Sequence, residues 1–165
     1  PAMIAAGASV CIAGPTGIHE IPVEQMAVSP GKTSLAQGEF VTSILLPNRP
    51  SNAGDAYLRF IPRTEMDIAV VGVGVSIELN ADGTCASARL SLGAVSATAQ
   101  LVKAASGILV GNKLDDTVLE ALASAASDAC SPIDDKRGTI EFRTKVAGVL
   151  ACRATKIAWQ RAENN

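Results

Sequence analysis

Apolar and polar residues alternate most clearly between residues 56 and 94, with the period of two that is typical of β-strands. An extended run at 56–60 leads into a polar elbow at residues 62–67, and an apolar strand is predicted over 68–79. The turn sequence Asn-Ala-Asp-Gly follows at once, and a second strand is predicted to return over 84–92. Segments joined in this way predict a three-stranded antiparallel sheet.

The apolar strand at 68–79 has two unlike faces. Gly72 and Gly74 leave one face flat, which predicts that another backbone or helix approaches it closely. This Gly-x-Gly pair is not a dinucleotide-binding fingerprint, because it lies inside a strand and no third glycine opens a helix. The opposite face carries only large aliphatic side chains, namely Val71, Val73, Val75, Ile77 and Leu79.

Shorter strands are predicted before this sheet, at 8–13, 18–23 and 39–46. A turn is predicted at 29–33. The loop at 48–55 is rich in Pro, Gly and Asn, and it marks the expected boundary between an opening piece and the main domain.

Helical periodicity takes over after the sheet. A short helix is predicted at 100–106, stopped by Gly107, and a second helix at 117–130, capped by Asp115 or Asp116. A long helix follows at about 140–161. Its predicted apolar stripe contains Phe142, Val146, Val149, Leu150, Arg153, Ala154 and Ile157.

Together these elements predict an α+β fold, in which the sheet packs on a bundle of two to three helices. The sheet is expected at about 56–93 and the helices at about 100–161. A strand-rich piece precedes them, so that the expected domains are 1–47 and 48–165.

Composition and charge exclude several classes of protein. Hydrophobic residues make up 48% of the 165 residues and charged residues 18%, which is enough apolar material for a packed core. The net charge of −2, without a basic patch interleaved with aromatics, speaks against nucleic acid binding. No apolar run reaches the ~20 residues that a membrane-spanning helix requires.

The four cysteines are far apart, and His19 is the single histidine, so the sequence predicts no zinc site. Reduced, mostly buried thiols and the absence of a recognisable signal peptide are typical of a cytoplasmic protein.

The elbow is the one place where several groups able to bind a ligand cluster. Arg59 and Arg63 could hold an anion or lie against a planar ring. Glu65 and Asp67 could equally pair with these arginines, which would leave a loop whose charges are satisfied internally. No nucleophile–base pair accompanies it, which disfavours an independent hydrolase. A free-standing protein-binding or assembly module is a further alternative, with the glycine face of the sheet or the Ala-rich helices as docking surface.

Four motifs, in order along the chain, resemble one family. The elbow and its strand, PRTEMDIAVVGVGVSI, are similar to RRxxxDIAxVxVA, with one arginine where two are common. ARLSLGAV is similar to LxLGGV, and RGTIEFRTKVAGVLACRATKIA to GSAEYRxxLAxVLxRRAL. AGPTGIHEIPVEQM and SPGKTSLAQGEFVTSILLP resemble the end of an FAD-binding domain and its exit strand. The chain thus resembles the FAD-binding medium subunits of molybdenum hydroxylases, the xanthine dehydrogenase and carbon monoxide dehydrogenase family.

The resemblance implies that residues 1–47 are the end of an FAD-binding domain and that 48–165 form a C-terminal domain. The family holds the FAD diphosphate with two glycine-rich loops, of AGGT(D) and TxGGN type, and neither occurs in this sequence. We therefore expect a C-terminal fragment of a longer subunit, inactive in isolation.

The resemblance also implies a flavin site. Val41 matches an aliphatic residue that packs on the isoalloxazine ring, and Arg59 a basic residue at the flavin edge. Arg63, Thr64 and Asp67 belong to a loop beside the flavin that tunes its access and potential. From the residues alone, Val41 could equally be a core residue, and Arg59 could pair with an acid of the elbow.

The implied cofactors are FAD on this subunit, and molybdopterin and [2Fe-2S] clusters on partners. The implied partners are a molybdopterin-binding large subunit and an iron–sulphur small subunit. FAD would pass electrons from the clusters to NAD or another acceptor.

Overall fold

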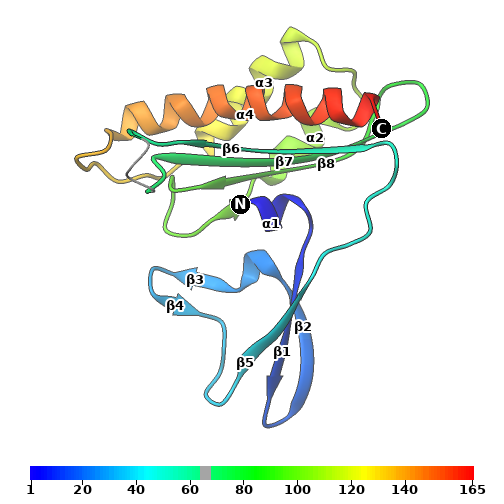
Figure 1. Ribbon diagram of the computed structural model, residues 1–165. Helices are drawn as coiled ribbons and strands as arrows, with labels where there is room; N and C mark the ends of the chain where they lie inside the picture. The colour runs from blue at the N-terminus through cyan, green and yellow to red at the C-terminus, as the bar shows by residue number, and fades with distance from the viewer. Residues whose placement is uncertain (64–67) are drawn as a thin grey trace.

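The computed structural model describes residues 1–63 and 68–165, which form two parts (Figure 1). The larger part is a four-stranded antiparallel sheet with helices on one face. Its strands follow the order β6 (Ala53–Phe60), β7 (Val71–Leu79), β8 (Cys85–Gly93) and β9 (Gln100–Leu101). Because β6 and β7 pair from Ala53 opposite Glu78 to Phe60 opposite Val71, both ends of the elbow lie at one end of this sheet.

Three helices cover the sheet, namely α2 (Lys103–Leu109), α3 (Asp116–Asp128) and α4 (Ile140–Glu163). Helix α4 lies along β6 and β7, α2 lies on β8, and α3 packs on both helices. The side chain of Asp115 caps α3 by accepting from the Val118 amide, and that of Thr139 caps α4 by accepting from the Phe142 amide.

The smaller part begins below the sheet in Figure 1 and consists of short strands. Strands β1 (Ser9–Gly14), β2 (Gly17–Pro22) and β5 (Phe40–Leu45) form an antiparallel sheet in the order β2-β1-β5. A 3-10 turn (Val23–Gln25) leads to a hairpin of β3 (Ala27–Ser29) and β4 (Lys32–Thr33), placed where the turn at 29–33 is predicted.

The glycine face of the large sheet is covered by the start of the chain, which contains the short helix α1 (Ala2–Ala5). A Cβ at Gly74 would lie 3.0 Å from the Pro1 carbonyl oxygen, and Ser91 Oγ donates to the same oxygen at 2.8 Å. The predicted close approach of a backbone to this face is confirmed. It also means that this docking surface of the alternative binding module is already occupied.

Helix α4 buries only part of the predicted stripe, since Leu150 and Ala154 are buried and Val146 and Ile157 pack against the core. Phe142, Val149 and Arg153 are exposed, so their assignment to the core is wrong. The buried face consists mainly of small residues, among them Ala147, Ala151, Ala154, Ala158 and Ala162. A Cβ at Gly54 of β6 would overlap the Ala158 carbonyl, so small residues let the helix backbone lie directly on the sheet. The Ala-rich surface is thus also used within the chain.

The predicted fold class is confirmed, with local differences. Residues 100–101 form β9 rather than the start of a helix, because the edge of β8 is open there and Leu92 pairs with Gln100. The following helix begins at Lys103 and continues through Gly107. Strand β7 begins at Val71 rather than at 68, and β6 begins at Ala53, inside the predicted boundary loop.

Candidate functional site

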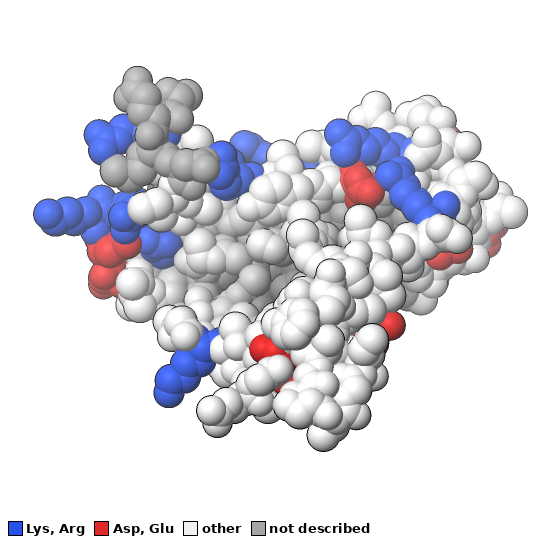
Figure 2. All heavy atoms as spheres, turned by 60° about the horizontal axis from the view of Figure 1, so that its bottom comes forward, with Lys and Arg blue, Asp and Glu red and all other residues white. Residues whose placement is uncertain are grey.

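The candidate site lies at the end of the large sheet where β6 ends and α4 begins. Arg59 and Arg63 are both exposed there, Arg59 opposite Gly72 in the strand register. Thr64 and Asp67 lie outside the described residues. Figure 2 shows Lys and Arg side chains gathered on this side of the molecule, with a hollow between the two parts.

Val41 lies in the other part of the molecule, on β5. All six residues of β5 are exposed, and Val41 itself is 39% exposed, so it is not part of a core formed within these 165 residues. Its exposed apolar neighbours are Phe40, Ile44, Leu45 and Leu46. An apolar strip of this length on an edge strand is suited to contact with a flat apolar group or another chain segment.

A hollow of about 410 Å³ opens between the hairpin and residues 68–69, which directly follow the elbow, and we call it the elbow hollow. It contains Pro30 of the hairpin and Ile68 and Ala69 at the exit of the elbow. The rest of the lining comes from the turn after β8, the loop before α4 and the first turn of α4, namely Ala94, Ser96, Ala97, Ser131, Pro132, Ile133, Asp135, Arg137 and Arg143. The two parts of the molecule thus share one concave surface.

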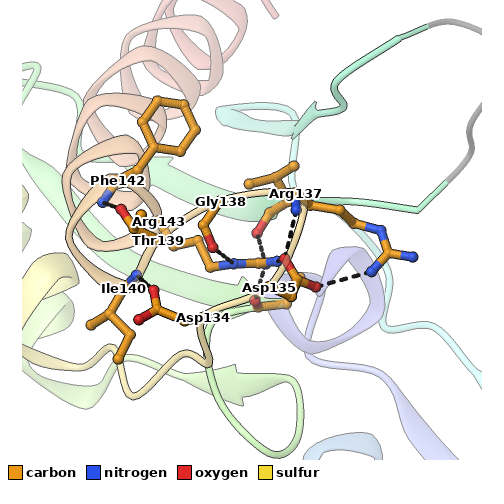
Figure 3. Close-up of polar contacts among 10 residues, drawn as sticks. Asp134, Asp135, Arg137, Gly138, Thr139, Ile140, Phe142 and Arg143 are labelled. Carbon is orange, nitrogen blue, oxygen red and sulfur yellow. Dashed lines mark hydrogen bonds and ion pairs between the residues drawn. The ribbon is translucent and has the colours of Figure 1, made fainter.

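One wall of the elbow hollow is an ion-pair network around Asp135 (Figure 3). Asp135 Oδ1 accepts from Arg143 Nη2 at 2.7 Å, and Oδ2 accepts from Arg137 Nη1 at 2.9 Å. The backbone amide of Arg137 also donates to Oδ1, at 2.8 Å. These hydrogen bonds, from the Arg137 amide first and then from the arginine side chains, lower the pKa of Asp135 to about 2, so the carboxylate is charged at neutral pH.

This network was not predicted from the sequence. Two signals could have found it: an arginine in the first turn of an otherwise small-residue helix face, and an acid eight residues before it. Arg143 is the one buried charged residue among residues 1–63 and 68–165. A buried guanidinium requires a carboxylate and carbonyl partners, and the loop before α4 supplies the carboxylate.

A second hollow, of about 460 Å³, lies between the start of the chain, the 3-10 turn and Tyr57 of β6. Arg89 of β8 spans this junction, because Nε donates to the Ile4 carbonyl at 2.9 Å and Nη2 donates to Glu24 Oε1 at 3.0 Å. The same side chain therefore ties the first helix and the 3-10 turn to the large sheet.

Thiol and metal chemistry have little support in the described part of the chain. The four cysteines are free, and burial raises the pKa of Cys85 and of Cys130 to about 11, which makes them poor nucleophiles. No group of three or more metal-ligating side chains occurs among the described residues. Within the same residues, no helix has the length and apolar character needed to cross a membrane.

Two family profiles match the chain. The CO dehydrogenase flavoprotein C-terminal domain matches residues 56–158, and the FAD binding domain in molybdopterin dehydrogenase matches residues 1–49. The chain therefore belongs to the CO dehydrogenase flavoprotein family, within the FAD-binding subunits of molybdenum hydroxylases. The resemblance found from the motifs is confirmed.

Individual relatives agree with this assignment. The carbon monoxide dehydrogenase medium chain of Afipia carboxidovorans is 32% identical over 96% of this chain and 54% of its own length. The xanthine dehydrogenase FAD-binding subunit of Escherichia coli O157:H7 is 26% identical over 80% of this chain and 45% of its own. The chain thus spans about half the length of these relatives.

Solved structures give the same result. A chain of reconstituted CO dehydrogenase from Oligotropha carboxidovorans superposes with a TM-score of 0.91 at 31% identity, covering 97% of this chain and 55% of that one. Quinoline 2-oxidoreductase from Pseudomonas putida 86 superposes with a TM-score of 0.84 at 25% identity, again over 97% and 55% of the two chains.

Proposed function

We propose that this chain forms one side of an FAD site in a molybdenum-containing hydroxylase or dehydrogenase. The flavin accepts electrons from [2Fe-2S] clusters on a partner subunit and passes them to NAD or another acceptor. The observation that carries the proposal is that two family profiles match this chain, over residues 1–49 and 56–158. The two matched stretches meet at the elbow hollow, although Val41, Arg59 and Arg63 are not among the residues that line it.

The proposed roles of the site residues come from the family resemblance. Val41 offers an exposed aliphatic surface on which an isoalloxazine ring can pack. Arg59 supplies a positive charge at the flavin edge, which stabilises the negative charge of the reduced ring. Arg63, Thr64 and Asp67 belong to the elbow beside the flavin and tune its access and potential.

In this proposal the chain holds half of the site. Residues 1–47 are the end of the FAD-binding domain with its exit strand, and residues 48–165 are the C-terminal domain. The diphosphate grip belongs to the two glycine-rich loops that the 165 residues do not contain. The isolated chain is therefore inactive, and electron transfer requires those loops, a molybdopterin-binding large subunit and an iron–sulphur small subunit.

A chimera tests the proposal. This chain would replace the matching stretch of the Afipia carboxidovorans medium chain, whose remaining part supplies the loops that the family resemblance implies. We expect the purified chimera to carry FAD, visible in its absorption spectrum. A well-folded chimera that never carries flavin would contradict the proposal.

The role of Arg59 is tested in the same chimera. Arg59→Gln removes the positive charge, so the reduced flavin is less stabilised and its reduction potential becomes more negative. Lys156→Gln, an exposed cation on α4, is the control and leaves the potential unchanged. An unchanged potential in the Arg59 variant would remove Arg59 from the flavin edge.

A further inference from the structure

The side chain of Arg143 makes polar contacts with several segments outside its own helix. It lies in the first turn of α4 and is buried, and its guanidinium reaches three segments of the chain (Figure 3). Nη1 donates to the Val70 carbonyl at 2.8 Å and to the Ala94 carbonyl at 3.1 Å. Nε donates to the Gly138 carbonyl at 3.4 Å, and Nη2 donates to Asp135.

The Val70 and Ala94 carbonyls lie at the same end of the large sheet. Val70 stands between the elbow and β7, and its own amide donates to the Phe60 carbonyl at 2.9 Å, which closes the elbow at its base. Ala94 follows β8 and has a φ of 65°, a left-handed conformation that a side chain disfavours by roughly 1–2 kcal/mol. Arg143 therefore fastens the base of the elbow to a strained turn at the same end of the sheet.

These contacts require an arginine whose planar guanidinium group is held in one orientation. A guanidinium donates in several directions from one rigid plane, whereas a lysine ammonium is a flexible point charge. Asp135 holds that plane, and Asp135 is itself held by the backbone amide of Arg137. Ala94 carries one of the bonded carbonyls, and Ile68 and Ala69 precede Val70, which carries the other. All three residues line the elbow hollow.

We infer that Arg143, oriented by Asp135, is a positioning residue that fixes the exit of the elbow and the adjacent wall of the elbow hollow. The inference about position rests on the contacts of this chain alone. Its consequence, that the pair tunes the flavin and the approach of the electron acceptor, rests on the proposed function.

Hydrogen exchange of the purified chain, followed by mass spectrometry, tests the positioning. Arg143→Lys and Asp135→Asn are the variants, and Arg161→Gln, at the other end of the same helix, is the matched control. We expect exchange in the peptide covering residues 68–73 to rise by about tenfold in both variants, because the Val70 amide loses the support of its neighbours. Exchange in the middle of α4 stays unchanged. Unaltered exchange at 68–73 in Asp135→Asn would overturn the inference.

The flavin consequence is tested in the FAD-containing chimera, assembled with its partner subunits. Arg143→Lys is expected to shift the flavin potential and to raise the KM for a dye acceptor more than it changes kcat, whereas Arg161→Gln changes neither. If exchange rises but potential and KM stay constant, the link to the flavin is wrong. If the chimera carries no FAD, the proposed function fails, while the exchange result still decides the positioning.

Discussion

The two ends of α4 are fastened to the large sheet by the same kind of contact in unlike surroundings. Arg143 Nη1 donates to the Val70 carbonyl at 2.8 Å, with 5% of its side chain exposed. Arg161 Nη1 donates to the Asp55 carbonyl at 2.7 Å, with 57% of its side chain exposed. The contact of Arg161 with the Asp55 carbonyl is open to water, whereas the contact of Arg143 with the Val70 carbonyl is buried. Burial rather than bond length therefore decides what each contact contributes.

The two ends also differ in how closely the backbones approach. Near Arg161, the glycine at position 54 lets the backbone of α4 at Ala158 and Ala162 lie directly on β6. Near Arg143, a polar network fills the space between helix, turn and strand. We therefore expect the C-terminal end of α4 to depend on packing and the N-terminal end on buried hydrogen bonds.

The largest effect is expected from Arg143→Ala. It leaves the buried Val70 carbonyl without this donor and Asp135 without its closest cation, which lowers the free energy of unfolding by roughly 3 kcal/mol. Arg161→Ala is the matched variant and costs less than about 0.5 kcal/mol. Urea unfolding followed by circular dichroism measures both losses in free energy of unfolding. Equal losses would show that the two ends of α4 do not differ in this way.

Gly54→Ala tests packing at the other end of the helix. The added Cβ overlaps the backbone of α4, so the helix and β6 move apart, with a loss of about 1–3 kcal/mol. In Gly107→Ala the added Cβ has no atom within 4 Å, and this change inside α2 raises stability by about 0.5–1 kcal/mol. If Gly54→Ala were as stable as the parent chain, the close approach of α4 would not matter.

Ala94→Gly tests whether the turn after β8, near the N-terminal end of α4, is strained. Glycine adopts a φ of 65° without the steric cost that alanine bears, so we expect a gain of up to about 1 kcal/mol in the free energy of unfolding. The family motif LxLGGV has glycine at this position, and this chain has alanine. A loss of stability in Ala94→Gly would show that the turn is not strained.

The smallest effect concerns pH. The pKa of Asp135 is lowered from 3.8 to about 2 in the folded chain, chiefly by the Arg137 amide and the Arg143 side chain. Its contribution to stability is therefore fully present above the ordinary pKa and is lost as the pH falls from about 4 to about 2. The difference in free energy of unfolding between the parent chain and Asp135→Asn should shrink across this window. A difference that stays constant from pH 6 to pH 2 would contradict the assignment.

The fold followed from the sequence where local signals agreed with the tertiary contacts. The alternation at 71–79 and the turn at 80–83 placed β7 and β8, since period and turn chemistry both depend on neighbours in sequence. The stripe of α4 was misjudged, because large residues such as Phe142 and Val149 outweighed alanines in the pattern. Which face a helix buries depends on the surface it meets, here the glycine of β6.

The site was only partly predictable. Arg59 and Arg63 could be located at the elbow, and the family resemblance suggested their role, which stays a prediction. The Asp135–Arg143 pair had local signals in the sequence, but the bonds of Arg143 to the Val70 and Ala94 carbonyls had none, because these residues lie far away in the chain. Long-range carbonyl contacts leave no periodic signal.

We propose that this chain holds half of a flavin site. The most direct test is to mix the purified chain with FAD, remove free flavin by gel filtration and record the visible spectrum, with the chimera as the positive control. We expect no retained flavin in the isolated chain and retained flavin in the chimera. Tight binding of FAD by the isolated 165 residues would contradict it, because the diphosphate grip would then lie within this chain.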